Sequence, residues 1–124
     1  MEFIEAPAFT RQVPNYLDDD EYLVLQNALA ENPAAGDLMP GTGGFRKMRW
    51  GDSRRGKGRR GGLRLIYYYF VIDQQIWLIT IYDKDEAADL TQSEKRALKN
   101  AIAAELDSRS TRRPSQRARS RRNR

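Results

Sequence analysis

Two long runs of β-branched and aromatic residues dominate the middle of the chain, and they constrain its fold more than any other feature. They cover residues 63–72 and 75–84 and are rich in Ile, Tyr, Phe, Val and Trp, the residue types that strands favour. The turn between them lies around Asp73-Gln74-Gln75. The pair therefore predicts an antiparallel hairpin, central in a sheet that also takes shorter strands from residues 1–5 and 45–50.

Helical patterns lie on either side of this central region in the sequence. Residues 7–16, 18–32 and 91–106 predict three helices, and the second and third begin with the signature of a capping box, an Asp or Thr followed three residues later by Glu. The order strand, two helices, three strands, helix predicts a compact α+β domain over residues 1–106, with helices against one face of a mostly antiparallel sheet. Residues 107–124 are rich in Arg and Ser, and we expect a disordered tail there.

The chain contains no cysteine and no histidine. This composition excludes disulfide scaffolds, thiolate zinc sites, cysteine nucleophiles, the Ser-His-Asp triad and His-ligated metals. No apolar run approaches the length of about 18 residues that a membrane span needs. The N-terminal residues lack the pattern of a signal peptide, so we expect a cytoplasmic protein.

Charge is strongly segregated along the sequence. Residues 1–45 carry a net charge of −7, residues 46–64 carry +8, residues 65–106 carry −3 and residues 107–124 carry +7. Residues 1–106 are thus slightly acidic, with a net charge of −2, and hold one basic island of nine Lys and Arg, followed by a basic tail. Clustered cations attract polyanions, so this pattern favours a nucleic-acid partner over an ordinary solvated surface.

Two other motifs resemble ligand-binding sites but do not indicate one. Gly51-x-x-x-x-Gly56-Lys57 has the spacing of a phosphate-binding loop, but Gly58 stands where that loop needs Ser or Thr, and a strand follows in place of a helix. The acidic residues between positions 83 and 89 match no calcium-binding loop and precede a helix, where acids are favoured by the helix dipole. We predict no metal and no cofactor.

Arg64, Tyr82 and Lys84 form the set with the most chemical content. Tyr82 and Lys84 are two residues apart in one predicted strand, so they share a face of the sheet. With a three-residue turn at positions 73–75, Arg64 would lie directly opposite Lys84 and Ile66 opposite Tyr82, whereas a two-residue turn would move Arg64 to the other face. Two directly opposed cations repel each other, which is easier to explain if a phosphate lies between them.

Several motifs follow one another in order along the chain. They are Gly41-Thr42-Gly43-Gly44-Phe45-Arg46-Lys47, Gly56-Lys57-Gly58-Arg59-Arg60-Gly61-Gly62, Arg64-Leu65-Ile66-Tyr67-Tyr68, and Leu78-Ile79-Thr80-Ile81-Tyr82-Asp83-Lys84-Asp85-Glu86. Together with Asp89-Leu90-Thr91 and the helix that follows, this series resembles the HigB-type toxins of the RelE/ParE superfamily. The resemblance extends from the first predicted strand to about residue 106.

The resemblance implies the toxin of a bacterial toxin–antitoxin pair that cuts messenger RNA in the ribosomal A site and arrests translation. It implies a small antiparallel sheet with two N-terminal helices and one C-terminal helix. It also implies a cognate antitoxin as partner, in this branch a helix-turn-helix DNA-binding protein. The catalytic residues implied by position are Arg64, Tyr82 and Lys84. The implied contacts to RNA or the ribosome are Arg46, Lys47, Lys57, Arg59 and Arg60.

For such an enzyme we expect the substrate 2′-hydroxyl to attack the adjacent phosphorus. Lys84 would assist its deprotonation, Arg64 would stabilise charge on the phosphoryl oxygens, and Tyr82 would orient the phosphate or protonate the leaving 5′ oxygen. Two alternatives remain open. The same sheet is shared with gyrase-directed ParE toxins, which are not nucleases, and a non-catalytic nucleic-acid-binding protein would use the basic island without the three-residue set.

Overall fold

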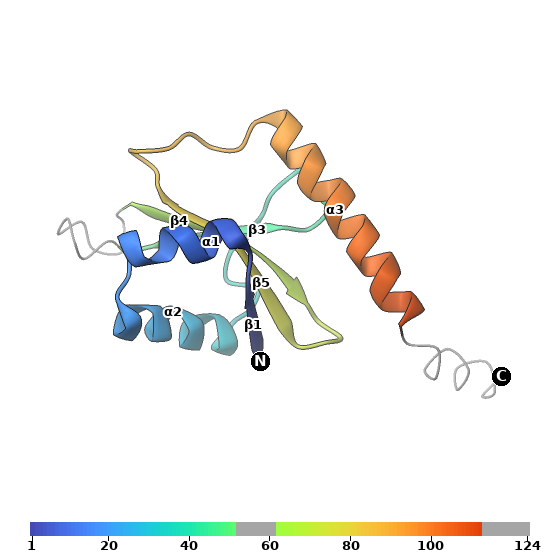
Figure 1. Ribbon diagram of the computed structural model, residues 1–124, viewed down its shortest axis with the longest axis horizontal. Helices are drawn as coiled ribbons and strands as arrows, with labels where there is room; N and C mark the ends of the chain where they lie inside the picture. Colours follow the sequence, from blue (N-terminus) through green and yellow to red (C-terminus); the bar gives the residue numbers. More distant parts are fainter. Residues whose placement is uncertain (52–61, 113–124) are drawn as a thin grey trace. The chain divides into compact units, whose positions relative to one another are not determined.

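The computed structural model describes residues 1–51 and 62–112 (Figure 1). Its elements in chain order are β1 (Glu2–Glu5), α1 (Pro7–Gln12), the 3₁₀ helix η1 (Val13–Asn15), α2 (Asp19–Glu31), β2 (Asp37–Leu38), β3 (Arg46–Trp50), β4 (Leu63–Phe70), β5 (Gln75–Asp83) and α3 (Gln92–Thr111). The chain divides into two compact units. The first holds residues 1–40 and 44–89, and the second holds residues 41–43 and the segment from residue 90 on.

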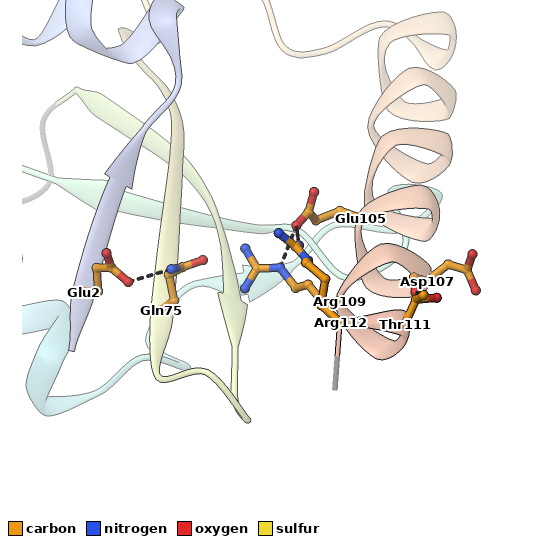
Figure 2. A network of polar contacts seen from close by, with 7 residues as sticks. All are labelled: Glu2, Gln75, Glu105, Asp107, Arg109, Thr111 and Arg112. Atoms are coloured by element: carbon orange, nitrogen blue, oxygen red, sulfur yellow. Dashed lines mark hydrogen bonds and ion pairs between the residues drawn. The ribbon is translucent and has the colours of Figure 1, made fainter. Parts of the chain in front are cut away.

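The first unit is built on a five-stranded sheet with the strand order β1-β5-β4-β3-β2. Strand β1 runs parallel to β5, and the other neighbouring strands are antiparallel. At the β1 edge, the Gln75 side chain donates a hydrogen bond of 2.7 Å to the Glu2 carboxylate (Figure 2). The β4–β5 hairpin lies in the middle of the sheet, as predicted from its continuous apolar sequence.

One face of this sheet packs against α1, η1 and α2 and forms the hydrophobic core. The fully buried side chains of this core include Phe9, Leu25, Leu29, Leu63, Leu65, Tyr67, Ile76, Leu78 and Ile81. Helix α2 begins at the predicted capping box, where Asp18 Oδ1 accepts a hydrogen bond of 2.8 Å from the Glu21 amide, and Glu21 Oε1 accepts one of 3.0 Å from the Asp18 amide. Such a cap contributes about 1 kcal/mol.

The other face of the sheet carries two different sets of side chains. Near the β4–β5 turn it is aromatic, with ring centroids 5.2 Å apart for Phe45 and Tyr68, 4.7 Å for Tyr68 and Phe70, and 5.0 Å for Phe70 and Trp77. At the opposite end of the same strands it is charged. Helices α1, η1 and α2 pack on the first face, whereas the charged end borders an open pocket.

The second unit is organised around α3. The helix begins at the second predicted capping box, with Glu94 N donating to Thr91 Oγ1 at 3.1 Å and Thr91 N donating to Glu94 Oε1 at 2.8 Å. Gly43 has a φ of 77° and lies so close to α3 that a Cβ there would be 3.0 Å from Ile102 Cγ2. A side chain at position 43 is therefore disfavoured by both backbone conformation and space.

Helix α3 continues to Thr111, five residues beyond the predicted end of the helix at residue 106. Glu105 Oε2 accepts from Arg109 Nε at 2.8 Å and from Arg112 Nη2 at 2.9 Å (Figure 2). Thr111 Oγ1 also donates to the Asp107 carbonyl at 3.1 Å. Contacts one and two turns apart support helical residues that have no apolar pattern of their own. The rest of the predicted tail, residues 113–124, lies outside the described part of the chain.

The predicted fold class, a mostly antiparallel α+β arrangement with two N-terminal helices and one C-terminal helix, is confirmed. The two-residue strand β2 was not predicted, because residues 33–44 have the composition of turns. Strand β4 ends at Phe70, two residues before the predicted end. Within residues 1–51 and 62–112, no helix has both the length and the apolar character that crossing a membrane requires.

Candidate active site

A row of three polar side chains crosses the central strands at the charged end of the sheet. Arg49 on β3 is paired directly with Arg64 on β4, and Arg64 is paired directly with Tyr82 on β5. Directly paired residues project to the same face of a sheet, so two guanidinium groups and a phenol lie side by side. Like charges in direct opposition destabilise a sheet, and a bound anion between them would remove that cost.

The row borders an open pocket of about 800 Å³ that lies within the first unit. Its charged lining consists of Lys47, Arg49, Arg64, Lys84, Asp37 and Asp89. Three alanines complete much of the remaining wall, so the pocket has small side chains around a cationic centre. A cavity with more cations than carboxylates, of this size and open to solvent, is suited to an anionic ligand.

Tyr82 is almost fully buried, with 9% of its surface exposed, and its hydroxyl donates a hydrogen bond of 3.0 Å to Asp89 Oδ1. Burial, followed by the hydrogen bond to Asp89 and the charge of that carboxylate, raises the pKa of Tyr82 to about 12, and the Arg64 charge opposes the rise. Tyr82 therefore keeps its proton at neutral pH and acts as a hydrogen-bond donor, and it is unsuited to act as a base.

Asp89 lies in the turn-rich segment between β5 and α3. Its Oδ1 accepts from Tyr82 and also from Lys47 Nζ, at 3.3 Å. The hydrogen bonds from Tyr82 and Lys47, together with the Lys47 charge, lower the pKa of Asp89 below its ordinary value, and the Arg64 charge adds to this effect. The carboxylate is thus ionised at neutral pH and lies among the cations of the pocket.

Lys84 follows the last residue of β5, and its amide donates to the Gly62 carbonyl at 2.8 Å, which continues the pairing with the segment before β4. The Asp83 carboxylate accepts from the Asp85 amide at 2.8 Å and bends the chain after Lys84. The exposed Lys84 side chain lines the same pocket as Arg64. All three predicted catalytic residues are therefore at or beside this pocket.

The predicted pairing of these residues is wrong in its register. Arg64 lies opposite Tyr82, rather than opposite Lys84. Phe70 pairs with Gln75, so the connection has four residues, 71–74, with Gln74 at a φ of 49°. A bulge then inserts one extra residue on β5, because Ile66 pairs with Thr80 while Tyr67 pairs with Leu78. The register at the turn alone would place Tyr82 on the opposite face from Arg64. The extra residue of the bulge reverses this and brings Tyr82 to the same face as Arg64.

The five residues predicted to contact RNA or the ribosome fall into three groups. Lys47 lines the pocket. Arg46 is paired with Tyr67, so it projects to the face that packs against the helices. Its Nη1 donates to the Gly36 carbonyl at 2.8 Å, and the structure does not bring it into the pocket. The remaining three lie outside the described residues, namely Lys57, Arg59 and Arg60.

Three of the pocket's charged residues were not predicted from the sequence, namely Arg49, Asp37 and Asp89. Arg49 had a detectable signal, because it is two residues from Lys47 in a predicted strand and must share its face. Asp89 had been interpreted as a helix N-terminal acid. No sequence signal connects it with Tyr82 or Lys47, which are 7 and 42 residues away. In residues 1–51 and 62–112, no three side chains of His, Cys, Asp or Glu are grouped so that they could hold a metal ion.

Comparison with protein-family models finds no match to this chain. Among solved structures, the isolated RelE toxin of E. coli can be superimposed with a TM-score of 0.45 at 15% sequence identity. The superposition covers 81% of this chain and 97% of the E. coli chain.

Proposed function

We propose that this chain is the toxin of a toxin–antitoxin pair, of the HigB type in the RelE/ParE superfamily, and that it cleaves messenger RNA on the ribosome. The observation that carries the proposal is the row Arg49–Arg64–Tyr82, whose two arginines line a cationic pocket together with Lys84. Simple attraction to nucleic acid requires neither a buried phenol nor two opposed guanidinium groups. A scissile phosphodiester requires donors of this kind.

Substrate binding would place a backbone phosphate between Arg49 and Arg64. A guanidinium is planar and always charged, and its paired N–H groups match the spacing of two phosphate oxygens. Negative charge builds up on these oxygens when the phosphorus becomes five-coordinate. Donors fixed by a central strand would then stabilise the transition state more than the ground state.

The chemical step would be an internal transesterification. The ribose 2′-oxygen bonds to the adjacent phosphorus, the bond from phosphorus to the 5′ oxygen breaks, and the products are a 2′,3′-cyclic phosphate and a 5′-hydroxyl. The proton from the 2′-hydroxyl would pass toward Lys84, and the leaving oxygen would gain a proton. Tyr82, which keeps its proton at neutral pH, would serve as the donor that orients the phosphate or protonates that oxygen.

The dependence on the ribosome follows from the same chemistry. Lysine and tyrosine ordinarily titrate about three units above neutral pH, so neither is a strong acid or base catalyst in the cytoplasm. Holding the messenger in an attack geometry would supply the missing rate enhancement. The cognate antitoxin, which we propose to be a helix-turn-helix DNA-binding protein, would keep the chain inactive until it is removed.

Primer extension on cellular messengers after brief expression tests the proposal. The wild-type chain is expected to produce new 5′ ends within translated regions, and Arg64→Ala and Lys84→Ala are expected to reduce them by about 100-fold, as removal of a transition-state donor commonly does. Arg11→Ala is the matched control, because Arg11 is exposed at the end of α1 and lies outside the pocket. Full cleavage by both pocket variants would refute the site assignment. Intact messengers with induced DNA-damage signalling would identify a gyrase-directed toxin instead.

A further inference from the structure

The position of Asp89 is unusual for a residue in a site that binds anions. Its carboxylate contacts groups that a phosphate would need, the Tyr82 hydroxyl at 3.0 Å and the Lys47 ammonium at 3.3 Å, and it also feels the Arg64 charge. The donors converge on one oxygen, Oδ1, as they would on a non-bridging phosphate oxygen. A carboxylate and a phosphate cannot both occupy this position, because they would repel each other and share the same donors.

We propose that the Asp89 carboxylate is the resident anion of the pocket and that a phosphodiester of single-stranded RNA binds by displacing it. This inference rests on the proposed function, because it takes the ligand of that site to be RNA. The Tyr82 hydroxyl and the Lys47 ammonium then exchange one anionic acceptor for another. The charge of the pocket is thereby kept partly compensated until a stronger anion arrives.

Three features of Asp89 allow this displacement. Its side chain is 70% exposed, so water can solvate the carboxylate as soon as it leaves. It belongs to the segment 84–91, which contains no helix or strand, so the backbone can move without breaking regular structure. Its contacts are one hydrogen bond and one exposed ion pair, and exposed ion pairs contribute little to stability.

Displacement of Asp89 by RNA also gives the carboxylate a role in the pocket before RNA binds. Without an anion, Lys47, Arg49, Arg64 and Lys84 would repel one another across the open pocket. With Asp89 in place, the cations are partly compensated, and weakly charged solutes must compete with a carboxylate that is tethered to the chain. Only a ligand that offers several phosphate oxygens to the same donors replaces it efficiently.

Binding of a fluorescein-labelled 2′-O-methyl RNA decamer to the full chain, followed by anisotropy at low ionic strength, tests the inference. The modified probe lacks the attacking hydroxyl, so binding is measured without cleavage and without the ribosome. Asp89→Asn is expected to bind the decamer about threefold to fivefold more tightly than Glu31→Gln, the range that loss of one exposed charge interaction allows. Glu31→Gln is the matched control, because it removes the same charge from an exposed residue at the end of α2.

A second pair of variants examines the exchange itself. In the wild type, Tyr82→Phe is expected to change affinity little, because the phenol gives up one anion to gain another. In the Asp89→Asn background, the same replacement is expected to weaken binding clearly, because the phenol then gains an anion only when RNA arrives. This dependence of one substitution on the other would not arise from a purely structural role of Asp89.

The outcomes separate the inference from the proposed function. If Arg64→Ala weakens binding but Asp89→Asn equals Glu31→Gln, the displacement is refuted while the site stands. Weaker binding by Asp89→Asn than by the wild type also refutes it, since the carboxylate would then support the pocket instead of competing for it. If binding is insensitive to Arg64→Ala, the pocket is not the RNA site, and both ideas fail together.

Discussion

The two faces of the central sheet use the same alternation of side chains for opposite purposes. On the face toward α1 and α2, Leu63, Leu65 and Tyr67 are fully buried in the hydrophobic core. On the other face of the same strand, Arg64 is only partly buried and lines a charged pocket. The packed face can thus hold the strands rigidly while the other face presents a row of like charges. The stability lost at the pocket is offset by burial one residue away.

The largest effect is expected on the packed face. Leu65→Ala should lower the free energy of unfolding by about 2–5 kcal/mol, because it removes a fully buried side chain from the core and leaves a cavity. Urea unfolding followed by circular dichroism measures this change. Leu23→Ala is the control, since Leu23 is 55% exposed on α2, and its replacement should change stability by less than about 1 kcal/mol. Equal losses for the two variants would contradict the assignment of the core.

Two tyrosines make the comparison sharper, because each hydroxyl takes part in a different kind of contact. Tyr67 Oη donates to the Pro33 carbonyl at 2.8 Å and accepts from the Gly36 amide at 2.9 Å. Tyr67→Phe should therefore cost about 1–3 kcal/mol, since it leaves backbone groups without their partners. Tyr82→Phe removes one bond to an exposed carboxylate and should cost less. The same unfolding measurement ranks the two, and the reverse order would show that the Tyr82 hydroxyl contributes more to stability than the Tyr67 hydroxyl.

Most of the packed face could be predicted from sequence. The run of β-branched and aromatic residues that begins at position 63 and two capping boxes were sufficient to place the hairpin and the helix starts, because those signals are local. Which face of the sheet Tyr82 occupies could not be predicted from such local signals. It depends on the length of the connection after Phe70 and on the bulge next to Ile66. Either of these two features without the other would place Tyr82 on the opposite face from Arg64.

The pocket also depends on contacts between residues far apart in the sequence. Lys47 and Asp89 are 42 positions apart, and Asp89 lies in a segment without periodicity. Pattern analysis detects which residues share a face of one strand, but it cannot detect which loop returns to that face. Arg64, Tyr82 and Lys84 lie on or directly after two strands joined by one turn, so sequence patterns could group them, whereas Asp89 lies further beyond the end of those strands.

A smaller effect with an unusual sign is expected from Arg49. Arg49→Ala removes one of two directly opposed cations, so it should raise the free energy of unfolding by about 0.2–1 kcal/mol while weakening the binding of RNA. Thermal unfolding and decamer anisotropy on the same preparation measure both quantities. A gain in stability without a loss of binding would mean that the opposed pair does not serve the ligand. Loss of stability would mean that Arg49 supports the sheet.

The smallest effect concerns a single phenol at high pH. The folded-state pKa of Tyr82 is about 12, above the value near 10 of an unfolded tyrosine, so its contribution to stability is complete below about pH 10 and is lost as the pH rises toward 12. Absorbance of tyrosinate, recorded for the wild type minus Tyr82→Phe, should isolate one group that titrates near 12.

Tyr22 and Tyr67 also have raised pKa values, and burial is the main cause for each. Both residues are present in the wild type and in Tyr82→Phe, so their absorbance cancels in the difference. Asp89→Asn should move the isolated transition downward without returning it to 10, because burial, the largest cause, remains. A transition that does not move would show that Asp89 exerts no influence on the phenol. The hydroxyl of Tyr82 would then reach an arriving phosphate without exchanging partners, and the two faces would differ in charge but not in how their tyrosines are held.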